Sequence, residues 1–150
     1  PEPRISNIPK LGGLDGRKMS KSYNNAIYLS DSDAEVTQKI KPMFTDPRRA
    51  RRNDPGDPDA CNLYPFHKIY SGVELRKEIA GDCRTAKIGC TDCKAKLLEN
   101  MLAGMRPHME KRREICAKPK IVCEILDAGG KAAQKVARAT LEEAKQAMGI

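Results

Sequence analysis

Residues 92–109, DCKAKLLENMLAGMRPHM, are the stretch that decides the fold of this chain. Its apolar residues recur every three or four positions, a spacing that places side chains on one face of an α-helix. These residues are Leu97, Leu98, Met101, Leu102, Met105 and Met109. We expect a long helix capped by Asp92 and kinked at Pro107, with this stripe packed into a core rather than around a cofactor.

The helical period extends in both directions from this stretch. Upstream, Gly81 and Gly89 are predicted to punctuate it. Downstream, Lys118-Pro119 is predicted to start a short helix that Gly129-Gly130 ends, and a last helix follows. The sequence therefore predicts an all-helical bundle over residues 59–150 and a mainly α fold class.

Residues 31–58 are predicted to form a linking helix and an exposed basic connector. Asp31-Ser32-Asp33 supplies an N-cap and acidic side chains for the first turn, and the apolar spacing continues to a helix end near Asp46-Pro47. The basic run at residues 48–52 follows, and the turn-forming residues 54–58 keep it at the surface.

Composition agrees with a helical and basic protein. Of 150 residues, 32% are charged and 4% aromatic, with no Trp, which argues against an all-β fold. The net charge of +8 favours a nucleic-acid partner, although a well-solvated helical surface accounts for the charge equally well. The chain has no apolar run long enough for a membrane helix, and it opens with neither an initiator Met nor a signal peptide. We expect a soluble, cytoplasmic and truncated protein.

Residues 1–30 contain the first motif that carries chemistry. The Gly-rich segment from Pro9 to Ser22 has no apolar period and is predicted to be a mobile loop. Its motif consists of Lys18, Met19, Ser20, Lys21 and Ser22. Two ammonium groups and two hydroxyls on such a loop can close over a triphosphate and stabilise the charge that develops on departing pyrophosphate. The alternative is a solvated Lys/Ser linker.

The motif and its surroundings resemble the tryptophanyl branch of the class I aminoacyl-tRNA synthetases. All five positions match the signature loop of that family, which reads Lys-Met-Ser-Lys-Ser. Further segments that resemble the family are residues 9–11, 13–17, 23–25, 45–47, 54–58 and 142–149. The resemblance therefore covers nearly the whole chain.

This resemblance implies a C-terminal half of a synthetase. Residues 1–30 would be the end of a Rossmann-type catalytic domain, and residues 59–150 the anticodon-binding domain. Lys18, Ser20, Lys21 and Ser22 would contact ATP and pyrophosphate. The full-length enzyme, a homodimer, would activate tryptophan with ATP and Mg²⁺ and transfer it to tRNA(Trp). The upstream His-Ile-Gly-His-type motif and the tryptophan pocket are not in this chain, so we expect it to be inactive alone.

Four of the six cysteines form the second constellation. Cys61, Cys83, Cys90 and Cys93 are spaced Cys-x21-Cys-x6-Cys-x2-Cys, and four thiolates suit Zn²⁺ or an iron–sulfur cluster. A zinc ribbon needs two close pairs on hairpins, whereas this setting is helical, which favours [4Fe–4S] with zinc as the alternative. Some bacterial tryptophanyl synthetases resemble this chain in carrying such a cluster. A structural role is the default hypothesis, and redox sensing is the sharper one.

The remaining candidate side chains are given structural interpretations. Cys116 and Cys123 are predicted to be small buried hydrophobes. His67 is predicted to be a packed or capping histidine rather than a base, and His108 to be exposed.

Basic residues near the connector and the cysteines are the candidates for tRNA binding. They are Arg48, Arg49, Arg51, Arg52, Lys87, Lys94 and Lys96. Lys and Arg hold phosphates, whereas unstacked anticodon bases are read by hydrogen bonds and stacking. Each of these residues is as readily explained as part of a solvated surface. Rival hypotheses for the chain are a noncatalytic RNA-binding iron–sulfur or zinc module and a class I synthetase for another amino acid, such as tyrosine.

Overall fold

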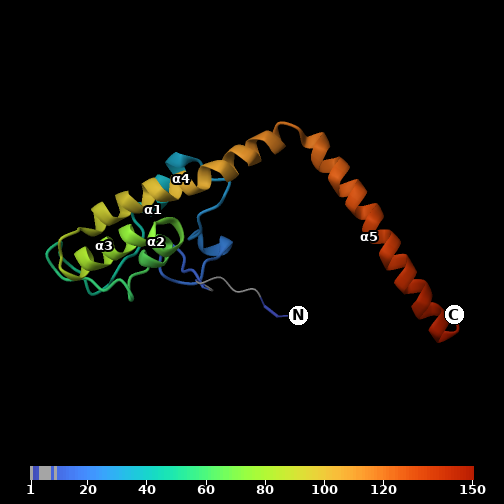
Figure 1. Cartoon of the computed structure of the whole chain (residues 1–150), viewed down its shortest axis with the longest axis horizontal. Helices are drawn as coiled ribbons and strands as arrows, with labels where there is room; N and C mark the ends of the chain where they lie inside the picture. Colours follow the sequence, from blue (N-terminus) through green and yellow to red (C-terminus); the bar gives the residue numbers. More distant parts are fainter. Residues whose placement is uncertain (1, 4–7, 9) are drawn as a thin grey trace. The chain divides into compact units, whose positions relative to one another are not determined.

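The computed structural model describes residues 2–3, 8 and 10–150, so Pro9, at the start of the predicted loop, lies outside the described residues. Within this part the chain forms helices and no strand, which confirms the mainly α fold class (Figure 1). The helices are η1 (Lys21–Tyr23, a 3-10 helix), α1 (Asp33–Ile40), α2 (Tyr64–Tyr70), α3 (Val73–Arg84), α4 (Cys90–Cys116) and α5 (Pro119–Met148). None of these helices is both long enough and apolar enough to cross a membrane.

The chain divides into two units, Pro1–Met109 and Glu110–Ile150. The predicted limits at residues 30/31 and 58/59 separate the end of a catalytic domain, a linking segment and an anticodon-binding domain. These limits stay predictions. So does the derivation of residues 1–30 from a Rossmann-type domain.

The core of the first unit is built on the predicted α4 stripe. Leu97, Met101, Met105 and Met109 are 0–8% exposed, as the helical spacing predicted. They form one cluster with apolar side chains of α1, α2 and the connecting segments. Figure 1 shows α1 and α2 alongside the N-terminal part of α4. Each large apolar side chain buried in this way contributes about 1.5–3 kcal/mol, so this cluster holds the helices together.

Helix α1 starts where the sequence predicted and ends earlier. Ser32 and Glu35 form a capping box, in which each side chain accepts a hydrogen bond from the backbone N–H of the other residue. The predicted end near Asp46-Pro47 is wrong. Lys41 still has helical backbone and donates its N–H to the Thr37 carbonyl, but Pro42 has no N–H to continue the series, and the helix ends at Ile40. Met43 lies beyond that end and is nevertheless buried in the core, at 2% exposure.

Two predicted features around α3 and α4 differ from the structure. Gly81 lies inside α3 rather than at its end, and the chain turns instead after Arg84, with Ala86 in the left-handed region at φ 56°. Gly89 does precede α4, which begins at Cys90, so Asp92 is a first-turn residue and not the cap. Its negative charge still favours a helix N-terminus.

Helix α4 continues through Pro107 to Cys116. Proline has no N–H, so the helix lacks the bond that residue 107 would have donated within it. The predicted kink at this position stays a prediction.

The second unit consists of the end of α4 and helix α5. The start at Lys118-Pro119 is confirmed, with Pro119 in the first turn. The predicted break at Gly129-Gly130 is wrong, because α5 continues to Met148 and ends at Gly149, which has a φ of 74°. Each glycine costs a helix about 1 kcal/mol relative to alanine, and the many alanines around the pair offset that cost. No residue of α5 is buried.

Candidate functional site

The Lys-Met-Ser-Lys-Ser motif is carried by a hydrogen-bonded turn. An antiparallel bridge joins Gly12 and Lys18, and the Gly13 N–H donates to the Arg17 carbonyl at 2.7 Å. At the tip, Gly16 adopts a φ of 80°, a conformation that favours glycine. The mobility predicted for this loop stays a prediction; its described part is held by the bridge and these backbone hydrogen bonds.

The centre of this turn is Asn25, a residue that the sequence analysis did not single out as functional. Its side chain is fully engaged: the Ser20 N–H donates to Oδ1 at 2.8 Å, and Nδ2 donates to Asp15 Oδ1 at 2.8 Å and to the Lys18 carbonyl at 3.1 Å. Asn25 is 3% exposed. A Cβ on Gly13 would lie 2.5 Å from Asn25 Cγ, so only glycine leaves room for this amide. The position just after the motif was the available signal.

The side chains of the motif divide into two groups. Lys18, Lys21 and Ser22 are exposed, whereas Met19 and Ser20 are half-buried. Met19 packs against the core, and the Ser20 hydroxyl caps η1 by accepting the Ser22 N–H at 3.3 Å. The turn therefore fixes the backbone between the two lysines and leaves both ammonium groups accessible.

Charged and aromatic side chains of the turn contact one another through Arg17. Asp15 and Arg17 form an ion pair at 2.6 Å, and the Arg17 guanidinium lies 4.7 Å from the centre of the Tyr23 ring. The hydrogen bond from Asn25 and those from Arg17 lower the pKa of Asp15 from 3.8 to about 2. Asp15 therefore stays ionised and keeps the Asn25 amide oriented.

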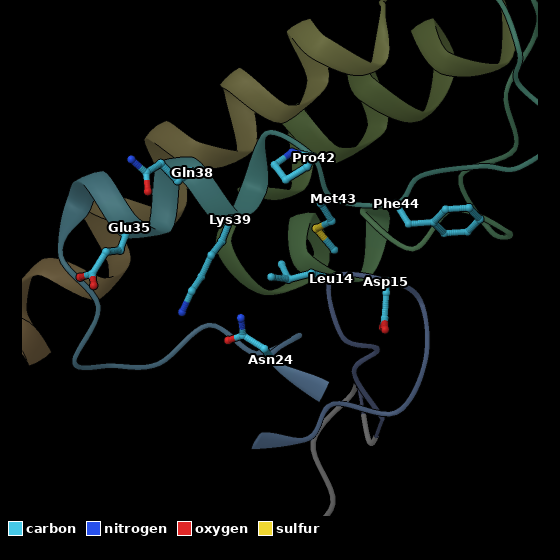
Figure 2. A pocket seen from close by; sticks show the side chains of 9 residues that line it. All are labelled: Leu14, Asp15, Asn24, Glu35, Gln38, Lys39, Pro42, Met43 and Phe44. Atoms are coloured by element: carbon cyan, nitrogen blue, oxygen red, sulfur yellow. The ribbon is translucent and has the colours of Figure 1, made fainter. Parts of the chain in front are cut away.

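A cavity of about 560 Å³ lies between this turn and α1. Figure 2 shows the side chains that line it: Leu14, Asp15, Asn24, Glu35, Gln38, Lys39, Pro42, Met43 and Phe44. In that view Lys39 extends from α1 toward Asn24. Its ammonium group is held by Asp31 at 2.6 Å and by the Tyr28 ring at 4.7 Å. The cavity thus combines apolar and charged side chains beside the turn that carries the Lys-Met-Ser-Lys-Ser motif.

The structure brings the four predicted cysteines within electrostatic reach of one another. All four are half-buried free thiols. Burial is the main cause that raises the pKa of Cys61, Cys83 and Cys93, and charge on neighbouring thiols raises each further; the pKa of Cys93 reaches about 12. Among the residues that the structure describes, no group of three or more His, Cys, Asp or Glu side chains is arranged as a metal site.

An arginine and a glycine lie against the sulfur of Cys83. Arg49 places Nη1 3.9 Å from Cys83 Sγ, while its Nη2 donates to the carbonyls of Arg52 and Ile88 at 2.6 and 2.7 Å. A Cβ on Gly56 would lie 2.6 Å from Cys83 Sγ, so glycine leaves the space that this sulfur occupies. Four thiols, a facing guanidinium and a clearance provided by glycine are chemically suited to zinc or to an iron–sulfur cluster.

A histidine contacts one of the four thiols, and the sequence analysis did not predict this contact. His67 is 0% exposed, which confirms that it is packed. Its Nδ1 lies 2.8 Å from Ser71 Oγ, and its Nε2 lies 3.4 Å from Cys93 Sγ. Burial lowers the pKa of His67, so the ring is favoured in its neutral form.

The two remaining cysteines are not where the sequence predicted. Cys116 and Cys123 are exposed rather than buried, because no residue of α5 is buried and Cys116 follows the last buried position of α4. The prediction that they are small buried hydrophobes is wrong. His108 is exposed, as predicted.

The predicted basic residues differ in how their charges are used. Arg48 pairs with Asp57 at 2.6 Å, Arg52 with Asp92 at 3.5 Å, and Lys96 with Glu78 at 2.8 Å. Lys94 donates to the Lys41 carbonyl at 2.7 Å. Within the described part of the chain, Arg51 and Lys87 are exposed and form no ion pair. Their charges are the ones left available to an anion.

Several of these arginines line a common cavity of about 300 Å³. Its lining includes Arg49, Arg51 and Arg52 together with Gly89 and the first three residues of α4, residues 90–92. The first N–H groups of a helix carry partial positive charge. The Asp92 carboxylate, which pairs with Arg52, also lines this cavity, so its lining carries charges of both signs.

Comparison with known proteins places the chain in a family. The family described as tRNA synthetases class I (W and Y) matches residues 1–103. Over the whole chain, identity is 44% with the tryptophan–tRNA ligase of Thermotoga maritima and 40% with that of Aquifex aeolicus. The chain spans 46% and 39% of the lengths of these two relatives.

A solved structure gives the same result. The tryptophanyl-tRNA synthetase from Campylobacter jejuni, complexed with ADP and tryptophan, matches with a TM-score of 0.82 and 29% identity. The match covers 98% of this chain and 46% of that protein. The chain belongs to the class I tRNA synthetases of the tryptophan and tyrosine group.

Proposed function

We propose that this chain is the C-terminal part of a cytoplasmic tryptophan–tRNA ligase, whose full-length homodimer activates tryptophan with ATP and Mg²⁺ and transfers it to tRNA(Trp). The observation that carries the proposal is the pair of exposed lysines, Lys18 and Lys21, on the turn built around Asn25. The identity with tryptophan–tRNA ligases supports tryptophan rather than tyrosine. In this proposal residues 1–30 end the catalytic domain, residues 31–58 link the domains, and residues 59–150 bind the anticodon.

The proposed chemistry needs positive charge where pyrophosphate leaves. The carboxylate of the amino acid attacks the α-phosphorus of ATP, and the bond to pyrophosphate breaks. Within the described residues, neither Lys18 nor Lys21 forms an ion pair that would compete for a phosphate. Ser20 and Ser22 can donate hydroxyl protons to the same oxygens. Groups that meet the charge as it develops lower the barrier without needing to bind ATP more tightly.

The test is Lys21→Ala in the full-length protein, with the exposed Lys10→Ala as the matched control. Loss of one donor to developing charge lowers kcat by about 10²–10³-fold. We expect tryptophan-dependent exchange of pyrophosphate into ATP to fall by that factor in Lys21→Ala, with the KM for tryptophan and the control unchanged. Full-length protein that exchanges only with tyrosine, or a Lys21→Ala variant with normal kcat, would contradict the proposal. RNA binding without exchange would favour the alternative, a noncatalytic RNA-binding module.

We further propose that Cys61, Cys83, Cys90 and Cys93 hold a [4Fe–4S] cluster, with zinc as the alternative. Two observations support this proposal. The other three thiols lie close enough to raise the pKa of Cys93, and the Arg49 guanidinium lies beside Cys83. These four cysteines would hold the metal group, which would cross-link the Cys61 segment, α3 and α4. The default role is structural.

The metal proposal is tested by Cys90→Ser against Cys123→Ser. The control removes an exposed thiol from the other unit. Anaerobically purified wild type and Cys123→Ser should show the visible charge-transfer band of the cluster, with iron and sulfide in equal amounts, and Cys90→Ser should lose both. Colourless protein that contains zinc would mean that the four cysteines bind zinc instead of an iron–sulfur cluster. Wild-type protein that contains neither iron nor zinc would contradict the proposed metal site.

The proposed anticodon side is the basic surface around the arginine cavity. The candidates remain Arg48, Arg49, Arg51, Arg52, Lys87 and Lys94. Arg51→Ala should weaken tRNA binding and lower the slope of log affinity against log salt by about 1, because one phosphate contact is lost. The control is Lys77→Ala on α3, whose lysine pairs with Glu74. Equal salt slopes for wild type and Arg51→Ala would contradict this role.

A further inference from the structure

His67 makes the contact that carries the inference. Its imidazole lies on α2 and has no solvent exposure. Nδ1 lies 2.8 Å from the hydroxyl of Ser71, the C-cap of α2, and Nε2 lies 3.4 Å from the sulfur of Cys93, in the first turn of α4. Both ring nitrogens of a buried histidine are thereby used, one for orientation and the other against a thiol.

The direction of these hydrogen bonds follows from the state of the sulfur. A thiolate bound to metal has no proton and can only accept. Nε2 must then carry the ring proton and donate it to Cys93 Sγ, and Nδ1 must accept from the Ser71 hydroxyl. The Ser71 hydroxyl, itself on a 7% exposed residue, can donate to Nδ1 in that tautomer and so holds the orientation of the ring.

We propose that His67, oriented by Ser71, is a positioning residue of the thiol site that donates its Nε2–H to the Cys93 sulfur when that sulfur holds metal. The inference rests on the proposed four-cysteine metal site. It adds a residue that is not a ligand and that lies on a different helix from Cys93. The hydrogen bond fixes the sulfur in place and withdraws electron density from it.

Two measurable consequences follow. Loss of a hydrogen-bond partner of a metal ligand costs about 10–100-fold in metal affinity. Hydrogen bonds to ligand sulfur also set the reduction potential of an iron–sulfur cluster, so removing this one should make the cluster harder to reduce. A tenfold change in the ratio of reduced to oxidised cluster at fixed potential corresponds to about 59 mV for one electron.

The experiment compares four variants of the whole chain. His67→Leu removes the donor and keeps an apolar side chain of similar bulk, His67→Gln keeps an N–H near the Nε2 position, and Ser71→Ala removes only the orienting hydroxyl. His108→Gln is the matched control, because His108 is the other histidine and is exposed. Circular dichroism checks folding. Chelator competition measures the affinity for Zn²⁺ and Co²⁺, and anaerobic titration measures the potential of the reconstituted cluster.

We expect His67→Leu to bind Zn²⁺ and Co²⁺ about 10–100-fold more weakly and to shift the Co²⁺–thiolate absorption. His67→Gln should retain most of the affinity, Ser71→Ala should lie between, and His108→Gln should match wild type. If burial of leucine unfolds the chain, the comparison of Ser71→Ala and His67→Gln still decides the role.

Two negative outcomes are distinct. Wild type that binds neither iron nor zinc overturns the metal site and this inference together. Wild type that binds metal, with Ser71→Ala and both His67 variants equal to it in affinity, potential and Co²⁺ spectrum, overturns only the role of His67.

Discussion

The two units of this chain are both helical, and they differ in what covers their apolar side chains. In the first unit Phe66 and Leu97 are at most 1% exposed, packed among α1, α2 and α4. In the second unit the apolar face of α5 is open, and Ile125 and Leu126 are 66% and 67% exposed. The comparison teaches that an amphipathic pattern predicts a helix without supplying the surface against which that helix packs.

The two units also rely on different interactions. Helices as short as α1 and α2 are marginal in isolation and depend on packing. Helix α5 is long enough for its own hydrogen bonds, with help from pairs such as Lys120–Glu124 at 3.9 Å and Lys145–Glu142 at 3.4 Å. Substitutions of the same kind in the two units should therefore have different effects.

The largest difference is expected for leucine truncation. Leu97→Ala should destabilise the first unit by about 2–5 kcal/mol, because it leaves a cavity in the α1, α2 and α4 cluster. Leu126→Ala should change stability by less than about 0.5 kcal/mol, because that side chain is already exposed. Urea unfolding followed by circular dichroism measures both. An equal loss of stability in the two variants would mean that the apolar face of α5 is covered in solution. It would contradict the difference in burial between the two units.

Glycine substitution should act in opposite directions. In Gly13→Ala the new methyl group collides with the Asn25 amide and should cost about 1–3 kcal/mol through local distortion. Nothing lies within 4 Å of a Cβ at Gly130 in the described structure, so Gly130→Ala should stabilise α5 by about 1 kcal/mol. Thermal unfolding and helix content test the pair. A stabilising Gly13→Ala would show that Asn25 does not organise the turn.

Helix capping should show a smaller contrast. Ser32→Ala removes the capping box of α1 and should cost about 1 kcal/mol. Lys118 makes no side-chain cap hydrogen bond at the start of α5, so Lys118→Ala should leave stability nearly unchanged. Similar losses in thermal unfolding would indicate that Lys118 stabilises α5 by an interaction other than capping.

The smallest effect should appear in a single titration within the first unit. The amide of Asn25 is the main cause that lowers the pKa of Asp15 to about 2, so Asn25→Ala should raise that pKa toward 3.8. Since the folded pKa lies below the unfolded one, the stabilisation by Asp15 is present above pH 3.8 and is lost as the pH falls through about 2. NMR titration of the Asp15 carboxyl measures this.

Asn24→Gly is the control for that titration, because Asn24 is exposed and has a φ of 49°, which glycine accepts readily. Its Asp15 carboxyl should titrate as in wild type. An unchanged Asp15 pKa in Asn25→Ala would assign the shift to Arg17 instead.

Local signals predicted much of the fold. The α4 stripe was confirmed at Leu97, Met101, Met105 and Met109, and the start of α1 followed from Ser32. The predicted helix ends were wrong where the tendency of a proline or a glycine to end a helix was misjudged. Pro42 ended α1 and was overlooked, whereas Gly129-Gly130 was expected to end a helix that α5 in fact continues.

The candidate sites were predictable only as motifs. The spacing of the four cysteines indicated that they belong together, and the structure brings them within electrostatic reach. Asn25 was marked only by its position just after the motif, and His67 was predicted to be packed or capping but not to face a thiol, because no periodic pattern indicates such contacts. Their roles depend on partners that the fold brings beside them: Asp15 and Lys18 for Asn25, and Cys93 for His67.

The sequence by itself determined the helical fold class, the Lys-Met-Ser-Lys-Ser motif and the family, because each depends on residue type and spacing along the chain. Only the tertiary structure decided that α5 has no buried residue, that Cys116 and Cys123 are exposed, and that His67 faces Cys93. The physical reason is that periodicity is a local property of the chain. Which surface covers an apolar face, and which distant side chains meet, depends on how the helices pack.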